Sequence, residues 1–329
     1  MTNFSLLSLP FLDAGMEYND ILNGSWFSNY SSGISEYDNT FLVGIYITTG
    51  FTFLINLAGF VGNGMVIWLL GFHTKRNPFT IYILNLSVAD FSILTALAGL
   101  NTCWLLGVLP GIYCSDSLHE FFYAFFSFMF SASQFLLTAI SIDRCVCLSF
   151  PLWHKCHRPA HLSTIICAII WILTFLISAT PTITFLLTNR HYTYLRYYQF
   201  LLNAMLFTPV MFLSTLAMII KVCLMSPQRR RGRLLTVILL ALILFLLFAL
   251  PMNFIEYFYF YTSYFDEYLY EYGLICVSLD STINPLIYFL IGRRKRGRSR
   301  GSVKKILEKL FEEEGNCAET LEPTVQTEL

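Results

Sequence analysis

The sequence predicts an all-α protein, a bundle of seven transmembrane helices followed by a short amphipathic helix on the membrane surface. Three observations support this fold class: an apolar composition, seven long apolar runs, and an alternating distribution of positive charge. Hydrophobic residues make up 56% of the 329 residues and charged residues 13%, with a mean hydropathy of +0.60. Soluble proteins average about 25% charged residues. The composition therefore argues against a soluble enzyme, a disordered chain or a nucleic-acid-binding protein.

Each apolar run reaches the length of about 20 residues that a helix needs to cross a bilayer. The runs cover residues 41–71, 79–106, 119–149, 162–187, 198–225, 234–261 and 268–291. The connections between them are short, so residues 41–292 are predicted to form one membrane domain. The sequence shows no inverted internal repeat of the kind that marks many transporters.

Positive charge predicts the orientation of the bundle. Nineteen of the 21 Lys and Arg residues lie in or beside the first, third and fifth connections or in the C-terminal tail. Residues 1–40 contain none, and the remaining two, Arg190 and Arg196, lie in the fourth connection. Because basic loops stay in the cytoplasm, we expect an extracellular N-terminus and a cytoplasmic C-terminus.

The extracellular segment 1–40 is predicted to be disordered and glycosylated. It contains three Asn-x-Ser sequons, at Asn3, Asn23 and Asn29. Such sequons accept glycans only on the luminal side of a membrane. Their position therefore agrees with the predicted orientation.

The C-terminal region is predicted to form a cytoplasmic amphipathic helix over residues 293–313 and a disordered tail over residues 314–329. Apolar residues recur at helical spacing at Val303, Ile306, Leu307, Leu310 and Phe311. With the surrounding cations, this pattern favours binding to the lipids of the inner leaflet; a solvated charge run is the alternative. The last four residues, Gln326 to Leu329, fit a ligand of a PDZ protein, although chance explains so short a match equally well.

Short motifs occur in order along successive spans. They are Gly62-Asn63, Leu86-Ser87-Val88-Ala89-Asp90, Asp143-Arg144-Cys145, Trp171, Pro209, Phe245 with Pro251, and Asn284-Pro285-Leu286-Ile287-Tyr288. Together they resemble the rhodopsin-like G-protein-coupled receptors. Within that class, residues 75–80, 137–145 and 151–159 and the Pro251-Met252 pair resemble the Mas-related receptors, most closely the branch of the Mas proto-oncogene receptor. The resemblance implies a plasma-membrane receptor, not an enzyme, that activates heterotrimeric G proteins.

The resemblance also implies roles at the cytoplasmic ends of the spans. Arg144 is expected to contact the G protein, Asp143 to hold Arg144 at rest, and Tyr288 to take part in coupling. The base of the sixth span, residues 229–233, contains four arginines and no acid. The acidic lock that restrains the arginine in some relatives is therefore missing, and we expect some basal signalling.

Two acids lie inside predicted spans, where ionisable residues usually indicate function. For Asp90 the resemblance implies a sodium ion that holds the inactive state. The expected neighbours of Asp90 are Asn63, Ser133, Ser281 and Asn284. Asp280 is unusual, because many relatives carry Asn there. Two carboxylates in one dry site repel each other, so either sodium binds more tightly or one acid is protonated; a protonated acid without an ion is the alternative. No other cofactor is expected.

The predicted extracellular mouth is acidic and aromatic. Glu256, Asp266 and Glu267 alternate with tyrosines such as Tyr257. Carboxylates and aromatic faces attract cations, so we expect a basic peptide or cationic amphiphile, anchored by Glu256, which lies one turn past the proline of the sixth span. An aromatic belt at the membrane interface is the alternative for most of these tyrosines. Phe126, a further candidate ligand contact, replaces the aspartate of biogenic-amine receptors.

Two other functions stay open. One is an olfactory-type receptor for small molecules, since such receptors share the stretch from Asn284 to Tyr288. The other, less favoured, is a membrane transporter or channel. The pairing of the cysteines is open as well: Cys103 and Cys114 lie near the oxidising face, where a local disulfide can form, and Cys276 is a competing partner.

Overall fold

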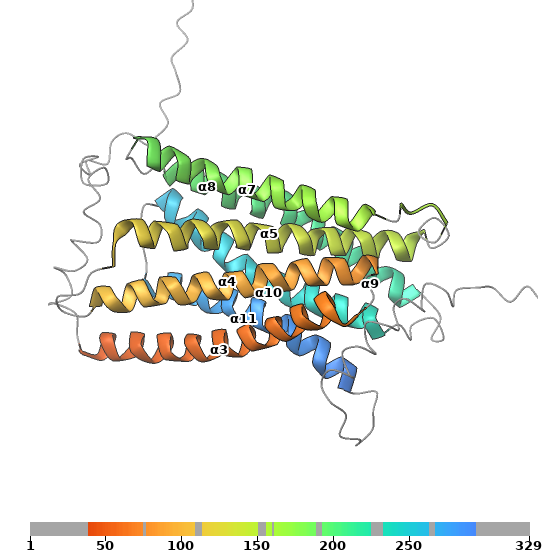
Figure 1. Cartoon of the computed structure of the whole chain (residues 1–329), viewed down its shortest axis with the longest axis horizontal. Coiled ribbons are helices and arrows are strands. Elements are labelled where there is room, and N and C mark those ends of the chain that lie inside the picture. The colour runs from red at the N-terminus through yellow and green to blue at the C-terminus, as the bar shows by residue number, and fades with distance from the viewer. Residues whose placement is uncertain are drawn as a thin grey trace, which may run out of the picture.

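The structure, a computed structural model, describes residues 39–74, 77–108, 114–150, 156–159, 161–188, 193–224, 233–262 and 267–293. Its elements are α3 (Asn39–Phe72), α4 (Pro78–Val108), α5 (Asp116–Ser149), α7 (Leu162–Thr188), α8 (Thr193–Leu202), η2 (Asn203–Phe207), α9 (Thr208–Leu224), α10 (Arg233–Thr262) and α11 (Glu267–Arg293). Figure 1 shows these helices side by side along one direction. Because α8, η2 and α9 follow one another without a break, the described residues form seven helical rods, and the predicted all-α bundle is confirmed.

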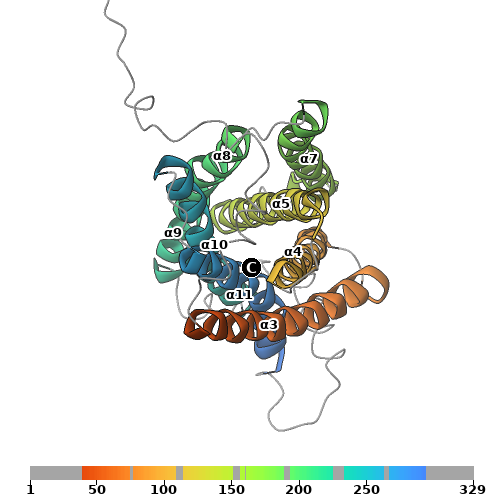
Figure 2. The same cartoon turned by 90° about the vertical axis from the view of Figure 1, so that its left-hand side faces the viewer.

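Helix α5 lies at the centre of the bundle. It packs against α4, α7, α9 and α10, whereas α3 packs against α4 and α11 at the edge. Figure 2, which looks along the bundle, shows α5 enclosed by the other helices. In the most apolar stretch of α5, 72% of the residues are buried, against 33% in α3 and 28% in α7. The side chains of α5 are therefore the ones that reach most of the other helices.

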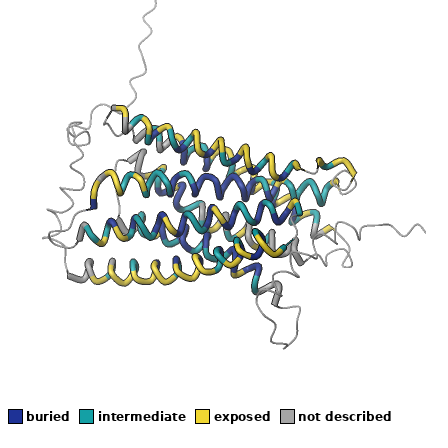
Figure 3. Tube along the Cα trace, viewed as in Figure 1, coloured by how far each residue is buried: buried dark blue, intermediate teal, exposed yellow. Residues whose placement is uncertain are grey.

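The outer surface of the bundle is apolar, as a lipid environment requires. Figure 3 shows exposed residues along α3 and α7 and buried residues along α5. Among the described residues, five rods are long and apolar enough to cross a membrane, and they lie at Tyr46–Phe72, Pro78–Leu106, Ser117–Ser149, Leu162–Thr184 and Tyr198–Lys221. Exposed apolar residues such as Phe51, Ile172 and Leu213 cover their outer faces. Such a surface is stable against hydrocarbon and not against water.

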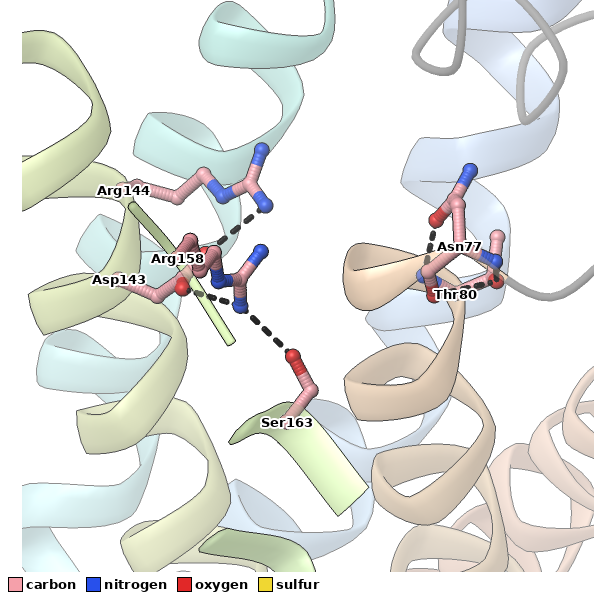
Figure 4. A network of polar contacts seen from close by, with 6 residues as sticks. All are labelled: Asn77, Thr80, Asp143, Arg144, Arg158 and Ser163. Carbon is pink, nitrogen blue, oxygen red and sulfur yellow. Dashed lines mark hydrogen bonds and ion pairs between the residues drawn. The ribbon is translucent and has the colours of Figure 1, made fainter. Parts of the chain in front are cut away.

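Helix α4 begins at a cap that the sequence specifies. The backbone N–H of Thr80 donates to Asn77 Oδ1 at 2.7 Å, and the backbone N–H of Asn77 donates to Thr80 Oγ1 at 2.8 Å. Figure 4 shows this reciprocal pair. Pro78 occupies the first helical position, where the missing N–H costs nothing. The cap satisfies donors that the first turn of the helix leaves without partners.

Helices α3 and α11 approach each other closely at two glycines. A Cβ atom at Gly59 would lie 3.0 Å from Thr282 Cβ and 2.8 Å from Leu94 Cδ1, and one at Gly62 would lie 3.0 Å from Pro285 Cβ. At both positions an added Cβ would lie closer to a neighbouring side chain than Cβ atoms normally do, so that neighbour would have to move. Small residues at a helix contact bring backbones together and increase packing in membranes.

The two ends of the bundle differ in chemistry. At one end, here named the disulfide end, Cys103 of α4 is bonded to Cys114, which precedes α5, with their Cα atoms 5.1 Å apart. This is the local bridge that the sequence left open, and Cys276 is free and buried. The opposite end, where Asp143 and Arg144 lie in the last turns of α5, is named the arginine end.

Several predicted features lie outside the described residues. They are the sequons at Asn3, Asn23 and Asn29, the amphipathic helix predicted for residues 293–313 except for its first residue, and the PDZ-type end at Gln326 to Leu329. These remain predictions from the sequence.

Candidate functional site

At the arginine end, one carboxylate pairs with two guanidinium groups. Arg144 Nη2 lies 2.9 Å from Asp143 Oδ2, and Arg158 Nη2 lies 2.7 Å from Asp143 Oδ1. The same Arg158 nitrogen donates to Ser163 Oγ at 2.7 Å. Figure 4 shows Asp143 between the two arginines, with Ser163 at the start of α7. The contact between Asp143 and Arg144 that the sequence predicts is therefore present as an ion pair.

An aromatic side chain of α4 lies beside this cluster. The guanidinium carbon of Arg144 lies 4.7 Å from the centre of the Phe79 ring on α4, within the range of a cation–π contact. Tyr288, the third predicted coupling residue, is buried on α11. Sequence reasoning counted Arg158 only as a marker of topology and missed its contact with Asp143. The contact of Arg158 with Asp143 depends on the path of the chain between α5 and α7, which the sequence pattern around Arg158 does not predict.

In the middle of the bundle, Asp90 of α4 accepts two hydrogen bonds. Ser133 Oγ of α5 donates to Asp90 Oδ1 at 3.0 Å, and Asn284 Nδ2 of α11 donates to Asp90 Oδ2 at 2.9 Å. All three side chains are buried. The structure thus brings together three of the residues predicted around Asp90, contributed by three helices.

The other predicted members lie nearby and contact different partners. Asn63 Nδ2 of α3 donates to the carbonyl oxygens of Gly59 and Ser281, at 3.0 and 2.8 Å, rather than to Asp90. Within the described part of the chain, Asn63 Oδ1 and Ser281 Oγ are buried without a hydrogen-bond partner. Asp280 is buried on α11.

The chemistry of these groups fits a sodium ion. Hard cations prefer carboxylate, hydroxyl and amide oxygens. Asp90 supplies a buried carboxylate, and the oxygens of Asn63 and Ser281 are buried acceptors that an ion could satisfy. In the described part of the chain, no three His, Cys, Asp or Glu side chains cluster to hold another kind of metal ion.

At the disulfide end, Tyr123 and Glu256 link α5 to α10. The hydroxyl group of Tyr123 donates to Glu256 Oε1 at 3.0 Å. Glu256 is half-buried, so its carboxylate belongs to the interior of the bundle rather than to its outer face. The expectation that Glu256 faces inward agrees with this contact. Tyr123 was not among the predicted site residues. It lies in a long aromatic run, where the sequence does not distinguish a residue that contacts Glu256 from its neighbours.

The remaining predicted ligand residues differ in their access. Phe126 lies one turn beyond Tyr123, is fully buried, and stacks on Phe130 with ring centres 5.5 Å apart. A ligand can touch Phe126 only if neighbouring side chains move. Tyr257 is exposed on α10. Asp266 and the side chain of Glu267 lie outside the described residues.

A further buried polar cluster joins three rods and was not predicted. Gln199 Nε2 of α8 lies within hydrogen-bond distance of Ser131 Oγ, at 2.9 Å, and of Ser178 Oγ, at 2.7 Å. Asn203 Nδ2 donates to the same Ser131 oxygen at 2.9 Å. Just beyond, the backbone N–H of Thr208 bonds back to the carbonyl of Asn203, five residues earlier. The cluster joins the fifth rod, formed by α8, η2 and α9, to α5 and α7. It lies where the π-turn of η2 begins.

Known proteins of similar sequence are seven-transmembrane receptors, which agrees with the seven helical rods. The family described as 7 transmembrane receptor (rhodopsin family) matches residues 62–288. Mas-related G-protein coupled receptor member D of Macaca fascicularis is 37% identical over 284 residues, which cover 82% of this chain and 87% of the relative. The human member D is 35% identical over 317 residues, covering 90% and 97% of the two chains. Proto-oncogene Mas of Mus musculus is 33% identical over 272 residues, covering 79% and 82%.

Proposed function

The chain belongs to the rhodopsin family of seven-transmembrane receptors and to its Mas-related group, and from that membership we propose a ligand and a direction of signalling for this multi-pass receptor of the plasma membrane. The proposed ligand is a basic peptide or a cationic amphiphile. It binds from outside the cell at the disulfide end, and the arginine end activates a heterotrimeric G protein in the cytoplasm. The extracellular N-terminus follows from the distribution of positive charge in the sequence.

The Glu256 carboxylate is the observation that supports a cationic ligand. It is half-buried near the disulfide end and is oriented by the hydroxyl group of Tyr123 at 3.0 Å. An oriented carboxylate attracts cations, and partial removal from water strengthens that attraction. A hydrogen bond between a ligand cation and Glu256 contributes about 1.5–3 kcal/mol, as is typical of bonds to charged groups.

A ligand screen followed by substitution of Glu256 tests this proposal. Cells that express the receptor are exposed to basic peptides and amphipathic amines, with calcium and cyclic-nucleotide responses recorded together. For an agonist found in this way, Glu256→Gln is expected to lower potency at least about tenfold, since the charge is lost while the shape is kept. Phe254→Leu, at an exposed position of the same helix to which no ligand role is assigned, is the control and should keep the potency of the parent. Unchanged potency of the Glu256→Gln receptor would remove Glu256 as the anchor.

At the arginine end we propose that Arg144 contacts the G protein after it leaves Asp143. The ion pair at 2.9 Å supports a resting state in which the arginine is held. Truncation of Arg144 to Ala is expected to abolish signalling while the receptor still reaches the cell surface. Ligand-gated current in cells without G proteins would favour a channel instead.

We also propose that sodium binds at Asp90 and stabilises the resting receptor. Asp90 would hold the ion, with the Asn63 and Ser281 oxygens, which are buried acceptors without partners among the described residues. The ion supplies a positive charge that neutralises the buried carboxylate. Ser133 and Asn284 orient that carboxylate through their hydrogen bonds at 3.0 and 2.9 Å.

A further inference from the structure

The carboxylate of Asp143 is shared between two arginines that reach it from different parts of the chain. Arg144 follows Asp143 on α5 and bonds Oδ2, whereas Arg158 comes from the segment before α7 and bonds Oδ1. The side chains of Asp143 and Arg158 are 9% and 6% exposed, so water screens this pair only weakly. The two guanidinium groups together carry one more charge than the carboxylate can neutralise.

Arg158 has a second anchor that Arg144 does not share. Its Nη2 also donates to Ser163 Oγ at 2.7 Å, and Ser163 is buried at the start of α7. Arg158 is therefore fixed to α7 as well as to α5. A movement of Arg144 away from Asp143 does not require Arg158 to move.

We propose that Arg158 is a positioning residue for signalling: it remains on Asp143 when Arg144 leaves, and thereby favours the release of Arg144. This inference rests on the proposed role of Arg144 in contacting the G protein. Two physical effects act in the same direction. A second cation on the carboxylate weakens the attraction between Asp143 and Arg144. When Arg144 leaves, the ion pair with Arg158 still stabilises the charge of the buried Asp143 carboxylate, which makes the departure less unfavourable.

A purely structural role for Arg158 makes a different prediction. If Arg158 only fastened the segment 156–159 to the bundle, its loss would loosen the arginine end whether or not Asp143 carried a charge. If Arg158 acts through Asp143, its effect disappears once the carboxylate is gone. Coupling between substitutions of this kind distinguishes the two mechanisms.

The experiment measures ligand-free signalling for the parent receptor, Arg158→Gln, Asp143→Asn and the double variant. Signalling is divided by the number of receptors at the cell surface. It is also measured as nucleotide exchange on purified G protein with excess receptor, so that a low basal rate is resolved. We expect Arg158→Gln to lower basal signalling about two- to fivefold, the range of one partly buried ion pair. Asp143→Asn should raise it, and the double variant should equal Asp143→Asn.

Three further variants make the result specific. Arg158→Lys keeps the positive charge and should recover most of the loss seen with Gln. His157→Gln changes an exposed neighbour in the same segment and should signal like the parent receptor. Arg158→Met, which keeps the length of the side chain, replaces Gln if that variant does not reach the cell surface.

Each outcome supports or overturns a distinct statement. Basal signalling that is unchanged or raised in both Arg158→Gln and Arg158→Met overturns the inference, as does an equal fall in the Asp143→Asn background. If Asp143→Asn and Arg144→Ala both signal like the parent receptor, the proposed function of the Asp143–Arg144 pair fails instead. A rise with Asp143→Asn and no fall with Arg158→Gln rejects only the role of Arg158.

Discussion

The contact between α3 and α11 allows one substitution to be worked out from the structure, Gly59→Ala. A Cβ atom at this position would lie 2.8 Å from Leu94 Cδ1 and 3.0 Å from Thr282 Cβ, and the Thr282 hydroxyl oxygen is closer still. Carbon atoms normally approach to about 3.5–4.0 Å. The helices must therefore move apart or the Thr282 side chain must turn, which also disturbs its hydrogen bond to the Ile55 carbonyl at 3.2 Å.

Two effects of opposite sign set the magnitude. Overpacking of a well-packed contact costs about 1–3 kcal/mol. Replacement of a helical Gly by Ala returns about 0.5–1 kcal/mol of helix propensity. The expected net loss is about 0–2.5 kcal/mol, centred on about 1 kcal/mol. Each kcal/mol lowers the melting temperature by about 2–4 °C for a large domain.

The assay is thermal unfolding of the purified receptor in detergent, followed by loss of the monodisperse peak or by reaction of buried cysteines with a dye. Gly50→Ala on the same helix is the matched control, because a Cβ there meets nothing within 4 Å. It should melt at or above the temperature of the parent. Thr282→Ala should recover part of the loss in the Gly59→Ala receptor. A Gly59→Ala receptor that melts as high as Gly50→Ala would refute the packing argument.

Three further predictions concern the sodium site, the disulfide and the helix cap. Asp90→Asn should abolish the difference in melting temperature between sodium and potassium chloride at equal ionic strength; a difference that persists would contradict sodium binding at Asp90. Cys103→Ser should lower stability by about 2–3 kcal/mol, the value expected for a short closed loop, and should make the melting temperature insensitive to reductant. Asn77→Ala should cost about 1 kcal/mol by removing the cap of α4, whereas Asn77→Asp, which keeps the acceptor, should melt close to the parent.

The sequence predicts the helices well wherever hydrophobicity and helical structure coincide. The predicted spans and the observed helices agree within a few residues at most ends. The largest difference is at the fifth span, which begins at Thr193 in the structure and was predicted from residue 198. The added residues contain Arg196 and two tyrosines, Tyr194 and Tyr197. Hydropathy marks only the apolar part of a helix. Here backbone hydrogen bonding extends the helix into a polar stretch that hydropathy does not mark.

The candidate site was predictable where a motif fixes the position of a residue. Asp90 with Ser133 and Asn284 is of this kind. Arg158 and Tyr123 were not predictable. Arg158 meets Asp143 through the path of the chain before α7, and Tyr123 meets Glu256 through the arrangement of separate helices. The sequence separation of Tyr123 and Glu256 is 133 residues, and no local pattern relates two such positions. They meet because α5 and α10 come together in the bundle near the disulfide end.

At the disulfide end the neighbouring helices are joined by links of different kinds, a disulfide between α4 and the start of α5 and a hydrogen bond between α5 and α10. Cys103 and Cys114 bind the ends of α4 and α5 into one covalent unit. The connection at residues 188–198 contains no cysteine, so no disulfide ties it to that unit. Between α5 and α10 at this level, the Tyr123–Glu256 hydrogen bond is a non-covalent link. If Glu256 anchors the ligand as proposed, a ligand that takes Glu256 from Tyr123 breaks a hydrogen bond between α5 and α10 and leaves the disulfide between α4 and Cys114 intact.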